Sequence, residues 1–289
     1  MNANPRDPCV RPRCGARARR ARVLVTALLV APLAAAGCGA SPPAAPAPAE
    51  SSSATASTAE RPVWDLVVMG DSVWIDIGAP FARAVEDARG VDVRVHTWIN
   101  PDQGSYTRGG GERSADLLAR LRTDEQLRAD IGEAEIILFD VPMGILNDTC
   151  TSDPHSTDVE AARACMAEGS AAYRADVGPI FDELVALRDP SQAMVRVTDV
   201  WQFLYPTFQA AGTLDVARST WQEMNGAVTD AADQHGIPVI HAYDAFTGPQ
   251  GDRDPVAAGD VSADQFHLTS QGQSRLIAMV LELGFAPLG

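Results

Sequence analysis

The run Val63–Ser72 reads VWDLVVMGDS, and its apolar part, Val63–Met69, predicts the first strand of the fold. Apolar residues without strict polar alternation are typical of a strand that is covered on both faces of a parallel sheet. The chain contains four further runs of this kind, at Val91–Trp98, Glu135–Val141, Ala193–Thr198 and Ile237–Ala242. Segments with helical spacing separate the runs, so the sequence predicts strands that alternate with helices.

The predicted helices have apolar residues three and four positions apart, and they cover Phe81–Ala88, Ser114–Arg128, Val177–Leu184, Val216–His235 and Leu276–Leu283. Parallel strands require right-handed crossovers, and strands that are apolar along their whole length are covered on both faces of the sheet. The fold class is therefore α/β, a three-layer α/β/α sandwich with a five-stranded parallel sheet, and the flavodoxin-like strand order 2-1-3-4-5 is expected by analogy. The stretch Asn147–Ser170 is too long for an ordinary connection, and we expect it to form one wall of the site.

The N-terminal part of the chain predicts export. Residues 1–37 contain the basic stretch Arg11–Arg22, the apolar stretch Val23–Leu33 and a small-residue cleavage pattern, which together are typical of a signal peptide. The pattern ends in Ala-Ala-Gly-Cys38, which resembles a bacterial lipobox, and Cys38 would then be lipidated. Ordinary cleavage after Ala36, which would give a secreted protein, is the alternative. The lipobox predicts an extracytoplasmic protein that contacts the cell membrane through its lipid anchor.

The residues that follow Cys38 predict a tether and one folded domain. Residues 39–60 are almost wholly Ala, Pro, Ser, Thr and Gly, which cannot bury a core and predict a disordered segment. Residues 61–289 are enough for a single domain with a sizeable core.

The cysteines agree with an exported protein. Of the five, Cys9 and Cys14 lie in the signal and Cys38 is the predicted lipid anchor, so Cys150 and Cys165 remain. In an oxidising compartment this pair predicts a disulfide, which would stabilise the fold by about 3 kcal/mol in the chain-entropy model. Two reduced, buried cysteines are the alternative.

Charge and composition exclude several classes of function. The net charge is −15, and the seven arginines of the signal leave the remaining chain more acidic still. Such a domain repels phosphate backbones and anionic lipids, so we expect no nucleic-acid partner. The chain has no lysine, which excludes Schiff-base and Ser-Lys chemistry. No metal is expected, because the chain lacks His-x-x-x-His and Cys-x-x-Cys and because the acidic string Asp252–Asp260, which predicts a solvated loop, lacks calcium-loop spacing.

Two motifs at opposite ends of the domain carry candidate chemistry. Ser72 follows the first strand, and His267 in Asp264-Gln-Phe-His precedes the last helix, so both belong at the carboxyl edge of the sheet. A nucleophilic serine needs a base, and a histidine base needs an orienting acid such as Asp264. A helix-capping serine and an exposed loop histidine are the alternatives. The other histidines predict structural or solvated roles: His96, His155, His235 and His241.

Gly70-Asp71-Ser72, Gly111, Asn147 and Asp264-x-x-His267 resemble the four blocks of the SGNH/GDSL hydrolase superfamily, in the family's order and over residues 63–285. The resemblance implies the three-layer fold and ester hydrolysis without a metal or an organic cofactor. It departs from the family where Val73 replaces a leucine. The third block, Gly144-Ile-Leu-Asn147, is also one residue longer than usual.

The resemblance also implies an oxyanion hole. Its donors would be the Ser72 amide, the Gly111 amide and the Asn147 side chain, because a tetrahedral intermediate needs two or three hydrogen-bond donors. Gly109 or Gly110 could take the place of Gly111, with Gly104 a further candidate, and Asn147 could be an ordinary turn residue.

The sequence therefore predicts an exported hydrolase that cleaves short acyl or carbohydrate acetyl esters through an acyl-Ser72 intermediate. A cell-surface binding protein that keeps the scaffold without hydrolysis is one alternative. A glycan O-acyltransferase with the same chemistry is the other. The expected partner is a small-molecule or glycan ester, and the oligomeric state stays open.

Overall fold

The computed structural model describes residues 60–99, 113–144 and 157–289. Within these residues five strands pair in parallel in the order β2-β1-β3-β4-β5. The strands are β1 (Val63–Gly70), β2 (Asp92–Ile99), β3 (Ile136–Phe139), β4 (Met194–Thr198) and β5 (Val239–Ile240). The predicted parallel sheet and its strand order are confirmed.

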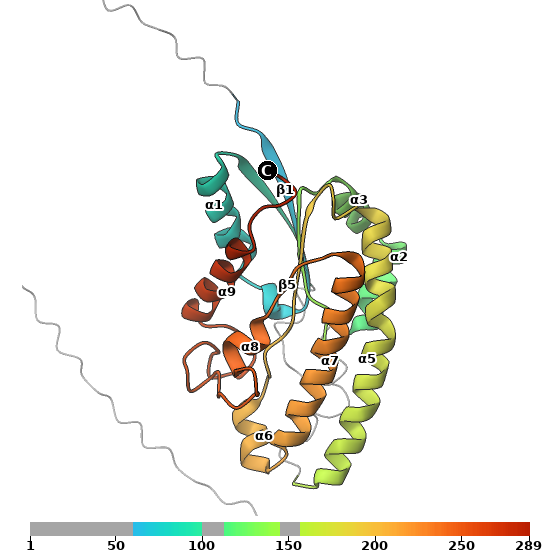
Figure 1. Cartoon of the computed structure of the whole chain (residues 1–289), viewed down its shortest axis with the longest axis vertical. Coiled ribbons are helices and arrows are strands. Elements are labelled where there is room, and N and C mark those ends of the chain that lie inside the picture. Colours follow the sequence, from blue (N-terminus) through green and yellow to red (C-terminus); the bar gives the residue numbers. More distant parts are fainter. Residues whose placement is uncertain (1–59, 100–112, 145–156) are drawn as a thin grey trace, which may run out of the picture. The chain divides into compact units, whose positions relative to one another are not determined.

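Helices cover both faces of the sheet (Figure 1). One face carries α1 (Gly78–Arg89) and α9 (Ser270–Glu282). The other face carries α2 (Ser114–Thr123), α3 (Glu125–Glu133), α5 (Val159–Leu187) and α7 (Leu214–His235). Three short helices complete the described elements: η1 (Ser72–Trp74), α6 (Tyr205–Ala211) and α8 (Ala242–Thr247). The α/β/α sandwich predicted from the sequence is therefore confirmed.

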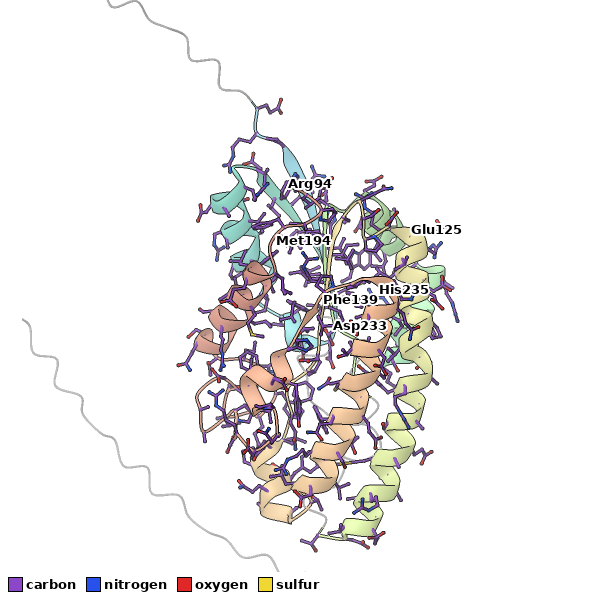
Figure 2. The ribbon with its side chains drawn as sticks, viewed as in Figure 1. Arg94, Glu125, Phe139, Met194, Asp233 and His235 are labelled. Carbon is purple, nitrogen blue, oxygen red and sulfur yellow. The ribbon has the colours of Figure 1, made fainter. Side chains whose placement is uncertain are left out.

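The core lies on both faces of the three central strands. All side chains of β3 and β4 are buried, whereas β2 at the sheet edge alternates between exposed and covered positions. On the α5 side, the ring of Phe139 meets Phe181 edge-on at 5.3 Å, and Phe181 stacks on His235 at 6.1 Å. Figure 2 shows Phe139 and Met194 inside the ribbon. The continuous apolar runs thus reflect burial on two faces.

Two element predictions are corrected by capping residues. The predicted helix Ser114–Arg128 is two helices, because Asp124 has extended backbone and its carboxylate accepts hydrogen bonds from the amides of Gln126 and Leu127, both at 3.1 Å. A side chain that caps a new helix competes with continuation of the old one. In the same way Asp158 caps α5. The second half of the predicted Asn147–Ser170 wall is therefore helical.

Several predictions fall on residues outside those described. They concern the signal peptide, the lipidation of Cys38 and the tether, and all three stay predictions. The predicted disulfide also stays a prediction, because Cys165 lies on α5 but Cys150 is outside the described residues. Among the helices that are described, none is long and apolar enough to cross a membrane.

Candidate active site

A sharp turn at the end of β1 places Ser72. Gly70 has a φ of 120°, and a Cβ at this position would lie 2.3 Å from Asp140 Oδ1 and 2.7 Å from the Asp140 carbonyl oxygen. Only a residue without a side chain fits between β1 and the end of β3. The chain then enters η1 directly, and Ser72 stands at the first position of this helix, at the carboxyl edge of the sheet.

Asp71 holds the turn together. Its amide donates to Asp140 Oδ1 at 3.0 Å, and its own Oδ1 accepts the Ser72 amide at 2.6 Å. Burial raises the pKa of Asp71, and hydrogen bonds from Ser72 and from the Met143 amide offset that rise only in part. The Ser72 amide is the first predicted oxyanion donor, so a substrate oxygen would compete with Asp71 for this N–H.

His267 is paired with Asp264 as the sequence predicts. The two side chains meet at 2.7 Å between His267 Nδ1 and Asp264 Oδ2. The other carboxylate oxygen of Asp264 accepts the Ser262 hydroxyl at 2.5 Å and the amides of Phe266 and His267 at 2.9 and 3.1 Å. Partial burial opposes ionisation of Asp264, but the hydrogen bonds from Ser262 and His267 outweigh it and lower its pKa to about 2. Asp264 is therefore ionised at neutral pH.

A buried ion-pair cluster fixes the segment that carries His267. Asp260 is 1% exposed, and its Oδ2 contacts Arg253 at 2.8 Å and Arg275 of α9 at 3.0 Å. Its carbonyl oxygen accepts the Thr269 amide at 2.9 Å. The prediction of a solvated loop over Asp252–Asp260 was therefore wrong for Asp260, because Arg253 of the same loop and Arg275 of α9 neutralise its charge in the interior.

Glycine also sets the distance between this segment and α9. Thr269 caps the helix by accepting the Gly272 amide at 3.2 Å. A Cβ on Gly272 would lie 2.1 Å from the Asp260 carbonyl oxygen. The first turn of α9 thus packs directly on the backbone at Asp260, and His267 lies just ahead of that contact.

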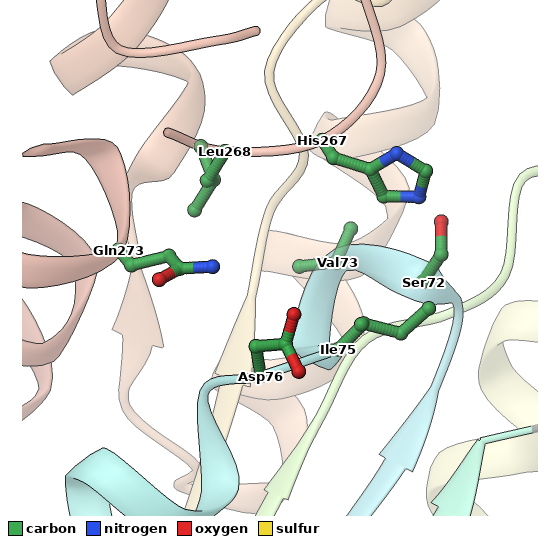
Figure 3. Close-up of a pocket in the computed structure, with 7 residues that line it drawn as sticks. All are labelled: Ser72, Val73, Ile75, Asp76, His267, Leu268 and Gln273. Atoms are coloured by element: carbon green, nitrogen blue, oxygen red, sulfur yellow. The ribbon is translucent and has the colours of Figure 1, made fainter. Parts of the chain in front are cut away.

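Figure 3 shows the Ser72 hydroxyl pointing toward the His267 ring. The ring nitrogen that it faces is Nε2, since the other nitrogen, Nδ1, contacts Asp264. Both side chains line a pocket of about 330 Å³. Val73, Ile75 and Leu268 form its apolar wall. The structure therefore brings together the serine, the histidine and the orienting carboxylate that the sequence predicts.

The other two predicted oxyanion donors, Gly111 and Asn147, lie outside the described residues, and their roles stay predictions. Two described residues close to them in sequence, Arg113 and Met143, pair in an antiparallel bridge. The Met143 amide in turn bonds to the Asp71 carboxylate. Arg113, which follows Gly111 by two residues, and Met143, which precedes Asn147 by four, therefore lie next to each other beside the Ser72 turn.

Sequence reasoning missed a second aspartate–histidine pair, which lies at the same edge of the sheet. His241 follows β5, and its Nδ1 lies 3.1 Å from Oδ2 of Asp199, which follows β4. Burial raises the pKa of Asp199, and the hydrogen bond to Asp199 raises the pKa of His241. Asp199 also accepts the Tyr243 amide at 2.6 Å. The signal that could have revealed this pair is an aspartate directly after the end of a strand. Asp71 and Asp140 occupy the same position after β1 and β3.

In residues 60–99, 113–144 and 157–289, no group of three or more His, Cys, Asp or Glu side chains is arranged to hold a metal ion. The chemistry of the described site is that of a hydroxyl, an imidazole and a carboxylate.

The same arrangement of strands and helices occurs in solved structures of lipolytic enzymes. A lipase from a goat rumen metagenome has a TM-score of 0.60 at 14% identity, over 78% of this chain and 100% of its own. An extracellular lipase from Streptomyces rimosus has a TM-score of 0.52 at 17% identity, over 76% and 99%. A phospholipase A1 from Streptomyces albidoflavus has a TM-score of 0.51 at 19% identity, over 76% and 98%. The chain has the fold of these enzymes.

At such identities the likeness establishes the fold. Each of these enzymes is covered over almost its whole length, so the shared architecture is the complete domain. No protein-family model and no curated protein sequence matches the chain.

Proposed function

We propose that this protein is an exported serine hydrolase of the SGNH/GDSL type that cleaves short acyl or carbohydrate acetyl esters through an acyl-Ser72 intermediate. The observation that carries the proposal is the Ser72 hydroxyl facing an imidazole whose other nitrogen is held by Asp264. A shared fold by itself does not define an activity. The proposal therefore rests on this arrangement of side chains, and the likeness to lipases agrees with it.

The first half of the reaction forms the acyl-enzyme. Asp264 accepts a hydrogen bond from Nδ1–H of His267, which leaves the Nε2 lone pair directed at Ser72. Ser72 Oγ attacks the ester carbonyl carbon while its proton passes to Nε2. The negative charge that develops on the carbonyl oxygen is stabilised by the Ser72 amide, with Gly111 and Asn147 as the further proposed donors.

The second half returns the enzyme to its starting state. The tetrahedral intermediate collapses, the ester C–O bond breaks, and the leaving alcohol takes the proton from His267 Nε2. A water molecule then attacks the acyl carbon and gives a proton to Nε2. The acid leaves as Ser72 Oγ recovers that proton. A sugar hydroxyl in place of this water would turn hydrolysis into acyl transfer by the same steps.

A covalent probe tests the proposal directly. A fluorophosphonate reacts with an activated serine, so mass spectrometry of the treated protein should find one adduct, on the peptide that contains Ser72. Ser72→Ala should abolish the adduct, and His267→Ala should slow its formation by at least about 100-fold. A folded protein that forms no adduct would contradict the proposed chemistry and favour a binding role for the scaffold.

The signal and lipobox pattern supports export with an anchor at Cys38. The proposed protein thus acts outside the cytoplasm, and the segment 39–60 holds its domain near the membrane. An extracytoplasmic enzyme of this kind would meet esters of the cell surface and of the surroundings.

A further inference from the structure

Asp76 has a backbone conformation that is uncommon for a residue with a side chain. Its φ is 62°, in the left-handed region, and it lies between η1 and α1. Such conformations in residues other than glycine are often found at functional sites, because the surrounding structure must maintain them. Here the consequence is that the Asp76 carboxylate lines the same pocket as Ser72 and His267.

Gln273 approaches this pocket from the opposite side. It lies in the first turns of α9, and Figure 3 shows its amide directed into the space near Asp76. The rest of the lining, apart from Ser72 and His267, is aliphatic and consists of Val73, Ile75 and Leu268. The pocket therefore combines an apolar wall with one carboxylate and one carboxamide at a distance from the reacting pair.

These two polar groups define the chemistry that the pocket can bind. A carboxylate accepts hydrogen bonds, and a carboxamide both donates and accepts them, so together they match a hydroxyl group, which does the same. An anionic group would be repelled by Asp76. A quaternary ammonium group is usually recognised by aromatic rings, and the lining side chains described here are aliphatic or polar.

A second pocket offers a separate place for an apolar group. It has a volume of about 480 Å³, shares Ile75 and Asp76 with the first pocket, and is lined further by Trp74, Val95 and Ile99. The boundary between the two pockets thus has a polar side near Gln273 and an apolar side along β2. An ester with a hydroxylated alcohol and an apolar acyl chain has the same two-sided character.

We propose that Asp76 and Gln273 form a hydroxyl-binding subsite that selects esters of polyhydroxylated alcohols, such as glycerol or a sugar. The inference rests on the proposed function and adds the class of alcohol to it. The pair acts by binding a hydroxyl of the alcohol while Ser72 attacks the carbonyl, so it determines specificity and takes no proton from the reacting atoms.

The test compares two esters that have the same acyl group. Glycerol monoacetate carries free hydroxyls and ethyl acetate carries none, and the ratio of their kcat/KM values measures the contribution of the subsite. Asp76→Gly removes the carboxylate and keeps the left-handed backbone, which glycine adopts freely. We expect the ratio to fall at least about tenfold in Asp76→Gly and about fivefold in Gln273→Ala, because a hydrogen bond to a charged group contributes more than one to a neutral group.

Two exposed positions provide matched controls. Asp87→Asn removes a carboxylate from α1, and Ser274→Ala changes the residue next to Gln273 on α9. Both controls should keep the ratio of the parent protein. A ratio that is unchanged in both Asp76→Gly and Gln273→Ala would overturn the subsite. A parent that prefers acetylcholine to glycerol monoacetate, with the preference lost in Asp76→Gly, would also overturn it in favour of a cation site.

The outcome separates this inference from the function on which it depends. A parent protein that hydrolyses both acetates, with a ratio insensitive to the two substitutions, keeps the proposed function and loses the subsite. A folded parent that hydrolyses neither ester and resists the fluorophosphonate contradicts the proposed function and the subsite together.

Discussion

Gly70 shows how one residue positions the candidate nucleophile. Its φ of 120° and the absence of a Cβ allow β1 to end against Asp140 before the chain turns to Ser72. Gly70→Ala should lower the free energy of unfolding by about 2 kcal/mol or more, because it adds both a clash and an unfavourable φ.

Gly90 provides the control for that prediction. It also has a positive φ, 67°, but a Cβ there would meet open space. Gly90→Ala should therefore cost about 1 kcal/mol, which is the conformational part alone. Thermal unfolding of both variants checks the difference, and an equal loss of stability would contradict the clash at Asp140.

Asp264 should stay ionised throughout the pH range of an ester assay. Hydrogen bonds in the folded protein lower the pKa of Asp264 from 3.8 to about 2. The ionised carboxylate therefore contributes fully to the stability of the fold above pH 3.8, and this contribution is lost as the pH falls through about 2. Asp264→Asn should reduce kcat by about 10²–10⁴-fold, because the amide cannot hold the imidazolium as the carboxylate does. Steady-state kinetics of an ester substrate from pH 4 to 9 measures this. A variant with the kcat of the parent would contradict the role of Asp264.

At the scale of residues, the sequence predicted contacts between residues that are close together in the chain. Ser72 follows a strand, and Asp264 lies three residues before His267, so the spacing in the sequence was enough to pair the acid with its base. Asp140 and Asp199 were missed because their partners, Asp71 and His241, are far away in sequence. Only the strand order makes them neighbours.

At the scale of elements, the position of α9 depends on Asp260. Its carboxylate joins Arg253 to Arg275 of α9, and the segment between Asp260 and the helix carries His267. Asp260→Asn should lower the free energy of unfolding by about 2 kcal/mol or more and should reduce kcat, because two guanidinium groups lose their buried counter-charge.

Asp252→Asn, at an exposed position of the same loop, should leave stability and kcat close to those of the parent. Urea unfolding and ester turnover measure both effects. An Asp260→Asn protein that is as stable as the Asp252→Asn control would show that the ion pairs do not hold this segment.

The ends of β4 and β5 should make stability depend on pH. The hydrogen bond to Asp199 raises the pKa of His241 above 6.5. The contribution of this pair to the free energy of unfolding is therefore fully present below pH 6.5 and is lost as the pH rises through the pKa of His241 in the folded protein. The parent should therefore lose stability between pH 6 and pH 9, and His241→Gln should lose less over the same interval. Thermal melts at the two values test it. Equal losses in the two proteins would contradict the pairing.

The sequence predicted elements best where burial is two-sided. Apolar runs located β1, β3 and β4, since central strands cannot expose either face. The break at Asp124 was missed because helical spacing continues across it, while a capping side chain decides the boundary. The long start of α5 was missed because residues 159–170 have little apolar periodicity, and Asp158 rather than an apolar face marks where the helix begins.

At the scale of the whole molecule, we expect the proposed lipid anchor to determine where the protein is located and to have no effect on its catalytic activity. Cys38→Ala should move the protein from the membrane fraction to the soluble exported fraction and leave ester turnover per molecule unchanged, because the predicted anchor precedes the unit Ser57–Gly289 that carries Ser72 and His267. Fractionation of the cells and mass spectrometry of the mature N-terminus check this. A Cys38→Ala protein that stays in the membrane fraction would contradict the lipid anchor.

The central claim is that Ser72 and His267 act as a nucleophile and its base. The most direct measurement is the turnover of p-nitrophenyl acetate and p-nitrophenyl butyrate by residues 39–289, in parallel with Ser72→Ala and His267→Ala. We expect hydrolysis by the parent and a loss of at least about 100-fold in each variant. Loss in the double variant should be no greater than in Ser72→Ala, because the two residues act as a unit. A folded parent without turnover, or a Ser72→Ala variant as active as the parent, would contradict it.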